Sequence, residues 1–272
     1  MSGFFVKLLT ESQSWMGEVR AVAPEQIACW RCLFGALAIA PFLRLRMLQW
    51  HPILVITACC FTLMNGLFIA AMSIGGVAEA AWLQYTAPFW VFLVQVIILR
   101  RSRASQRDWL ALAIAMTGVV IIVFGNLQSD QFASASMALG AGIAFAGVII
   151  GLSLLQHLSS IWLTFVNQLT AGLLALPWAM ATPWPEGWQW FILALFGAVQ
   201  VALPNWLLSK AMYHLPAHEA SLITLLDPLL APFWAYLITY QIPSSTTVAG
   251  GIIFLAALIL RYLPLRTTTA RT

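Results

Sequence analysis

The sequence predicts an all-α integral membrane protein with about ten transmembrane helices, arranged as two inverted five-helix repeats. Three observations predict this fold: an apolar composition, a series of helix-length apolar segments and an internal repeat. Of the 272 residues, 61% are hydrophobic and only 8% are charged. A soluble domain needs about a quarter of its residues charged to cover its surface, so this chain is expected to lie in a lipid bilayer.

The internal repeat relates the stretch from Asn65 to Pro88 to the stretch from Asn205 to Pro228. The two align without a gap at a constant offset (205 − 65 = 140). The informative matches are residues that are scarce in apolar helices, namely Asn65 with Asn205, Glu79 with Glu219, and Pro88 with Pro228. A repeat of this length indicates two homologous halves, which we place at residues 1–130 and 131–272.

Apolar segments of helical length follow one another along the chain with short linkers between them. They cover residues 3–17, 25–45, 53–74, 78–99, 108–125, 136–156, 160–181, 187–212, 217–240 and 245–265. The first is short, because Glu11, Gln13 and Glu18 soon follow its apolar run. It is expected to be a half-helix, a tilted interfacial piece or a truncated remnant of a longer helix. Each of the two repeated stretches ends in a helix, at 78–99 and at 217–240. Each of these two helices is expected to carry its proline, Pro88 or Pro228, at mid-length.

The positions of Lys and Arg predict the orientation, because cytoplasmic loops carry an excess of both. With the amino terminus inside, ten of the thirteen basic residues fall on the cytoplasmic side. These ten are Arg44, Arg46, Arg100, Arg101, Arg103, Arg107, Lys210, Arg261, Arg266 and Arg271. We therefore expect a multi-pass protein of the cell inner membrane with both termini in the cytoplasm. Five helices per half make the second half inverted, as in many secondary transporters that bind solute near the midplane.

Several short motifs resemble those of one transporter family. They are Pro216 to Ala220, Leu226 to Pro228, Ala231 to Trp234, Phe5 to Lys7, and Pro24 with Arg31. Together they resemble the EamA-type transporters of the drug/metabolite transporter superfamily over nearly the whole chain. The resemblance implies the fold of that superfamily and the transport of small solutes, with export as the direction.

Asp227 is the sharpest candidate for a functional residue, because it lies halfway along a predicted helix, directly before Pro228. A carboxylate at membrane depth costs about 2.5–3.5 kcal/mol and usually faces a cavity or a partner. Pro228 lacks an amide hydrogen and so frees a carbonyl one turn earlier. Either the two residues form a polar notch that binds an ammonium group or a proton, or Asp227 holds the kinked helix to a neighbour through a structural hydrogen bond.

Glu79 and Glu219 are candidates for gating or coupling, together with Pro88 and Pro228 on the same two predicted helices. In the inverted topology one glutamate lies near the outer face and the other near the inner face, where the gates of an alternating-access carrier would be. The alternative is structural, since an acidic residue in a first turn complements the helix dipole.

Arg31, Asn65 and Asn205 are candidate substrate contacts within the membrane. An intramembrane guanidinium can clamp a carboxylate through two parallel bonds; alternatively, Arg31 pairs with an acidic residue such as Glu25 or caps helix ends. The two asparagines either line a cavity or form hydrogen bonds between helices. Aligning the halves places Asn167 at the position equivalent to Arg31.

Aromatic residues flank these polar positions. Trp82, Tyr85 and Phe89 fall on one helical stripe, and Trp206 follows Asn205 directly. Such residues either wall a pocket for an aromatic or cationic solute, or pack between helices and against lipid. Trp82, Tyr85 and Trp206 are therefore further candidate substrate contacts.

These features predict a secondary active transporter and not an enzyme. The sequence contains no nucleotide-binding loop, metal-ligand spacing or catalytic triad, so neither a cofactor nor a metal is expected. The basic residues sit at helix ends and do not indicate nucleic-acid binding. The expected partners are a small-molecule solute and the lipid bilayer, and the protein is expected to be a monomer or a homodimer.

The leading hypothesis is the export of amino acids or related small amphiphilic metabolites by alternating access. Arg31 and Asp227 would then be contacts of opposite charge for a zwitterion. Efflux of organic cations or drugs, attracted by Asp227 and the aromatic residues, is the alternative. A membrane scaffold or a membrane-embedded enzyme is a third hypothesis, which would require titratable residues clustered at one depth.

Overall fold

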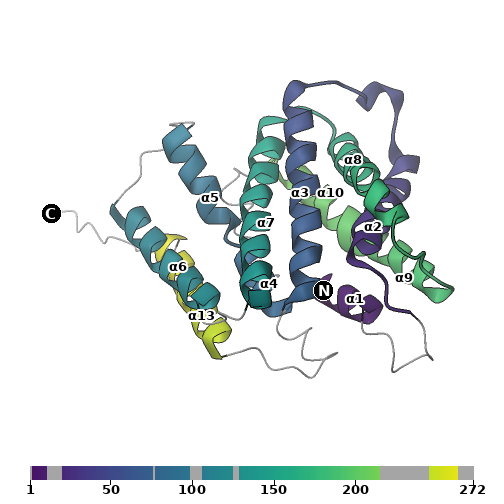
Figure 1. The fold of residues 1–272 in the computed structure, drawn as a ribbon. Coiled ribbons are helices and arrows are strands. Elements are labelled where there is room, and N and C mark those ends of the chain that lie inside the picture. The colour runs from purple at the N-terminus through teal and green to yellow at the C-terminus, as the bar shows by residue number, and fades with distance from the viewer. Residues whose placement is uncertain are drawn as a thin grey trace.

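A computed structural model describes residues 2–10, 20–75, 77–98, 106–124, 129–214 and 245–262. The regular elements among these residues are all helices (Figure 1). The α-helices are α1 (Ser2–Thr10), α2 (Pro24–Ile39), α3 (Pro52–Ile74), α4 (Val77–Gln84), α5 (Ala87–Leu93), α6 (Gln106–Phe124), α7 (Ser129–Leu154), α8 (Ser160–Met180), α9 (Trp188–Leu195), α10 (Leu203–Ala211) and α13 (Ser245–Tyr262). Short 3₁₀-helices, η2 (Ala40–Phe42) and η3 (Leu45–Met47), follow α2, and π-helices occupy η4 (Val94–Ile98) and η5 (Phe196–Ala202).

Nine of the ten predicted segments are helical where the structure describes them. The remaining segment, 217–240, lies outside the described residues, and so do Glu219, Asp227 and Pro228. Within the described part of the chain, five helical segments are long and apolar enough to cross a bilayer, namely Pro52–Ile74, Glu79–Ile97, Phe132–Leu154, Ser160–Met180 and Trp188–Ala211. Helix α1, with 9 residues, is too short to span by itself.

Prolines mark where two of these helices begin. α2 starts at Pro24 and α3 at Pro52, where a missing amide hydrogen costs nothing and the fixed φ favours the helix. Before α3, the Nδ1 atom of His51 accepts a hydrogen bond from the amide of Ile53 at 3.2 Å and caps the first turn.

The predicted helix over residues 78–99 is present as a helical segment with Pro88 at mid-length, but a turn before Pro88 divides it into two α-helices. α4 ends at Gln84, a turn follows at Tyr85 and Thr86, and α5 begins one residue before Pro88. The physical reason is that Pro88 has no amide hydrogen to donate to the carbonyl of Gln84. The hydroxyl of Thr86 donates to the carbonyl oxygen of Leu83 at 2.7 Å, which helps to close the turn.

The eighth predicted segment changes its helical form in the middle. α9 runs into the π-helix η5, and α10 resumes the α-helical form with Pro204 in its first turn. Pro204 cannot donate to the carbonyl four residues earlier, so the wider π register lies where the α-helical ladder would be broken. This wider turn lies against α2.

The most extensive helix contacts join α3 to α7, α6 to α13 and α2 to α8. In Figure 1, α3 and α7 run side by side in the middle, with α6 and α13 on one side and α2, α8 and α9 on the other. The central pair packs closely because α7 presents Gly151 to Thr57 of α3. A Cβ at Gly151 would lie 2.1 Å from the Thr57 hydroxyl oxygen, so only glycine permits this approach.

Candidate substrate site

The structure brings together two of the predicted site residues, Arg31 of α2 and Asn65 of α3. Arg31 is only 4% exposed, and its Nη2 donates a hydrogen bond to Oδ1 of Asn65. The guanidinium carbon also lies 5.0 Å from the ring centroid of Phe196, the first residue of η5. Phe196 in turn stacks on Phe5 of α1, with ring centroids 4.9 Å apart. The guanidinium therefore lies where α2, α3 and η5 meet.

Asn65 uses both ends of its amide to join α3 to α2. While Oδ1 accepts from Arg31, Nδ2 donates to the carbonyl oxygen of Ala28 at 3.2 Å and to Sγ of Cys32 at 3.0 Å. All three partners lie on α2, and Asn65 is 3% exposed. Of the two roles predicted for Asn65, the hydrogen bonding between helices is therefore present.

Arg31 keeps unused capacity to bind an anion. Its Nε has no hydrogen-bond partner among the described residues. No described carboxylate lies within ion-pair distance of Arg31, and Glu25, the acidic partner considered from the sequence, is exposed in the first turn of α2. Because a buried cation without a counter-charge is costly, Arg31 remains a candidate contact for an anion.

Close backbone packing of η5 on α2 fixes the surroundings of Arg31. A Cβ added at Gly197 would lie 2.3 Å from the carbonyl oxygen of Arg31 and 2.9 Å from the amide nitrogen of Gly35. A Cβ added at Gly35 would in turn lie 3.1 Å from the carbonyl oxygen of Gly197. Two glycines thus allow the helices to touch through their backbones and bring Phe196 over the guanidinium.

Helix α8 contributes a second group of buried polar side chains. Thr164, Asn167 and Gln168 are each at most 4% exposed. Thr164 Oγ1, Asn167 Oδ1 and both amide atoms of Gln168 lack hydrogen-bond partners among the described residues. Thr164 and Gln168 were not among the predicted site residues, although a polar residue within an apolar helix is the same signal that pointed to Asn65.

Asn205, the repeat partner of Asn65, has a different environment. Its Nδ2 donates to the carbonyl oxygen of Val201 in the preceding turn at 2.7 Å, and the side chain is only partly buried. Trp206 lies next to a cation, with Nζ of Lys210 at 5.2 Å from its ring centroid. The described structure therefore does not place Asn205 and Trp206 in the Arg31 centre.

The predicted aromatic stripe divides at the turn between α4 and α5. Trp82 and Phe89 both contact Phe254 of α13, with ring centroids 6.3 and 5.2 Å away, whereas Tyr85 contacts Phe145 of α7 at 6.0 Å. Trp82 is only 7% exposed. These residues therefore pack between helices.

Glu79 lies in the first turn of α4, as predicted, and also contacts the second half of the chain. The hydroxyl of Thr247 on α13 donates to its Oε1 at 3.0 Å. Pro88 is buried at the start of α5. The remaining predicted residues of this group, Glu219 and Pro228, and the predicted substrate contact Asp227 lie outside the described residues.

Comparison with known proteins identifies the family. Two regions of the chain, residues 9–124 and 133–263, match the model of the EamA-like transporter family. The chain belongs to this family. An uncharacterized transporter of Archaeoglobus fulgidus is 25% identical over 85% of this chain and 84% of the relative. The uncharacterized transporter YwfM of Bacillus subtilis is 24% identical over 93% and 91% of the two chains.

The chain is also similar to a transporter with a named activity. The pseudopaline exporter CntI of Pseudomonas aeruginosa is 24% identical over 78% of this chain and 75% of its own length. A solved crystal structure has the same fold, with a TM-score of 0.72 at 13% identity over 98% of this chain and 95% of the other. The protein is thus a membrane transporter of the EamA-like family, as its resemblance to that family implied.

Proposed function

We propose that this EamA-like protein is a secondary active transporter that exports amino acids or related small amphiphilic metabolites across the inner membrane. The observation that carries the proposal is the buried guanidinium of Arg31, which Asn65 holds in place and which has no described carboxylate partner. A substrate carboxylate would supply the missing charge and bind the unpaired Nε. The name of the pseudopaline exporter supports export of a metabolite.

Packing of the helices supports two inverted repeats, at residues 1–130 and 131–272. The second predicted helix of each half, α2 and α8, pack against each other, and so do the fifth helices, α6 and α13. Such pairing of repeat mates is expected when the halves are related by a pseudo-two-fold axis in the membrane plane. Ten helices, alternating access and both termini in the cytoplasm are parts of the same proposal.

The transport cycle that we propose uses two contacts of opposite charge. Arg31 would bind the substrate carboxylate, and Asp227 would bind its ammonium group. Asn205, Trp82, Tyr85 and Trp206 remain proposed substrate contacts on the path. Rocking of the two halves would expose the pair to one side of the membrane and then to the other.

Gating belongs to the helices that carry the repeated glutamates and prolines. Glu79 supports this part of the proposal, because its contact with Thr247 joins the two halves of the chain. By the repeat, Glu219 would have the corresponding gating role at the opposite face, together with Pro88 and Pro228.

Solute exchange in proteoliposomes tests the proposal. Preloaded amino acids, organic cations and nucleobases are offered one class at a time to the wild type and to the Asp227→Asn variant. Amino-acid exchange that is lost in the variant supports the proposal. Exchange of cations alone would instead establish the organic-cation carrier, and unchanged exchange in the variant would remove Asp227 from the site.

A further inference from the structure

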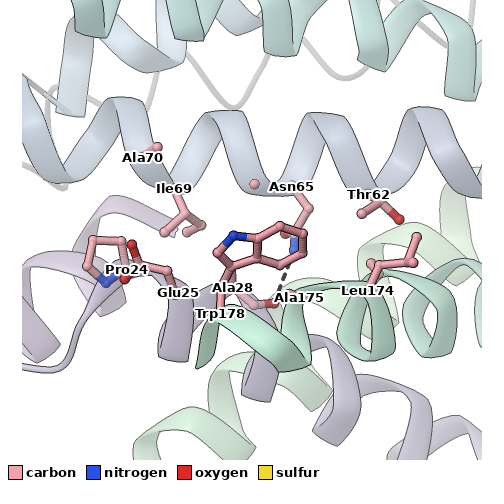
Figure 2. A pocket seen from close by; sticks show the side chains of 12 residues that line it. Pro24, Glu25, Ala28, Thr62, Asn65, Ile69, Ala70, Leu174, Ala175 and Trp178 are labelled. Atoms are coloured by element: carbon pink, nitrogen blue, oxygen red, sulfur yellow. Dashed lines mark hydrogen bonds between the residues drawn. The ribbon is translucent and has the colours of Figure 1, made fainter. Parts of the chain in front are cut away.

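A pocket separate from the Arg31 centre lies among α2, α3 and α8. Its volume is about 380 Å³, within the range of small-molecule sites. Figure 2 shows Glu25 at one end of the pocket, Thr62 and Leu174 at the other, and the indole of Trp178 between them. Arg31 and Phe196 are not among its lining residues.

The pocket is accessible from the side of the helix bundle. Trp178 is 65% exposed and Leu174 48% exposed, and both belong to a segment long and apolar enough to cross the membrane. On α3 the wall includes Gly66, and a Cβ added there would meet nothing within 4 Å. The opening therefore faces the lipid, and a molecule dissolved in the bilayer can reach it without passing through the transport path.

The polar lining residues are spread along the pocket, and two of the three already form hydrogen bonds within the protein. Thr62, at the end opposite Glu25, donates to the carbonyl oxygen of Ala58 in its own helix at 2.8 Å. Asn65 is occupied by its bonds to α2. Glu25 is the one charged lining residue, and it has no ion-pair partner among the described residues. The carboxylate of Glu25 therefore lies at one end of a mostly apolar pocket.

We propose that this pocket is a lateral binding site for amphiphilic amines, whose ammonium group pairs with Glu25 and whose alkyl body lies along Gly66 toward Leu174. Glu25 is in the first turn of α2 and Trp178 in the last turn of α8, so the charged end lies near one end of the bundle. An amphiphile in a bilayer has the same arrangement, with its head near the surface and its chain inside.

The site goes beyond the proposed transport function, but the two share a wall. Asn65 lines the pocket and also accepts the hydrogen bond of Arg31. An amine that presses on Asn65 therefore acts on the residue that orients the guanidinium. We expect such amines to modulate transport without occupying the Arg31 centre.

Photolabelling of the full-length protein in lipid nanodiscs tests the site without any transport assay. The probe is dodecylamine with a diazirine on its alkyl chain, and the crosslinked peptides are identified by mass spectrometry. The expected result is labelling on α3 and α8 around Gly66 and Leu174. The Gly66→Phe variant fills the pocket from its open wall and should reduce that labelling by about tenfold or more, since the site no longer has room for the chain.

Two comparisons separate recognition of the head group from simple partition. Glu25→Gln should weaken labelling by about two- to fivefold, as expected for an ion pair near water. Leu63 lies on α3, as Gly66 does, but at a lipid-exposed position outside the pocket. Leu63→Phe should therefore leave the labelling unchanged. Equal labelling in the Gly66→Phe variant, or equal labelling by the matching fatty acid probe, would overturn the proposal. These readouts stand even if the transported solute is not an amino acid.

Discussion

Replacing Asn65 with leucine tests whether the Arg31–Asn65 pair holds α2 to α3. Asn65 is 3% exposed and makes three hydrogen bonds to α2. Removing the acceptor of a buried guanidinium costs about 1.5–3 kcal/mol, and each neutral bond about 0.5–1.5 kcal/mol. Leucine regains about 1–2 kcal/mol through apolar burial. Taking the middle of each range, the expected net loss is about 3 kcal/mol, and we use about 2–4 kcal/mol.

Thermal unfolding of the purified protein in detergent measures this loss. For a chain of this size, a loss of 2–4 kcal/mol should lower the melting temperature by roughly 5–10 °C. Asn205→Leu is the matched control, because the repeat relates the two positions but, among the described residues, Asn205 donates only to the carbonyl oxygen of Val201, one turn earlier in the same helical segment. We expect the control to stay within about 2 °C of the wild type.

Two results would refute the reasoning. The first is an equal fall in melting temperature for the two asparagine variants. The second comes from combining Asn65→Leu with Arg31→Met, which removes both partners. Because no unpaired charge is then left behind, the losses should be less than additive by about 1.5 kcal/mol or more. Full additivity would mean that the two side chains do not depend on each other.

Two further substitutions test contacts between separate helical segments. Gly197→Ala should lower the melting temperature by several degrees, because the added methyl group lies 2.3 Å from the carbonyl oxygen of Arg31 and pushes η5 away from α2. Gly66→Ala, with nothing within 4 Å of the methyl group, is its control, and equal melting temperatures would contradict the backbone contact. Tyr213→Phe should destabilise the protein by about 1 kcal/mol, because the phenol donates to the carbonyl oxygen of Leu158 and links the turn after α10 to the turn between α7 and α8. A Tyr213→Phe variant that melts like the wild type would show that this bond contributes nothing.

Most helices could be predicted from the sequence, because helix length and hydropathy are local properties. The segments predicted at 53–74 and 160–181 correspond to α3 (Pro52–Ile74) and α8 (Ser160–Met180). The turn at Tyr85 and Thr86 was not predicted, although Pro88 gave a signal for it. A proline indicates that a helical bond is missing, but the packing of the flanking segments decides between a kink and a full turn.

The candidate site could be predicted only in part. Arg31 and Asn65 were identifiable separately, because polar residues are scarce in apolar helices. Their pairing depends on how α2 and α3 are rotated about their axes, which follows from tertiary contacts such as that of Gly197. Phe196 gave no signal at all, since it is one of 16 phenylalanines in an apolar chain.

The central claim is that Arg31 binds the carboxylate of the substrate, and competition in proteoliposomes tests it most directly. Exchange of a labelled amino acid is challenged with unlabelled amino acids and with the corresponding amino-acid amides, which lack the carboxylate. The wild type should prefer the acid by about tenfold or more, and Arg31→Gln should lose that preference while Arg31→Lys retains part of it. Equal competition by acid and amide in the wild type, or an undiminished preference for the acid in Arg31→Gln, would contradict the account.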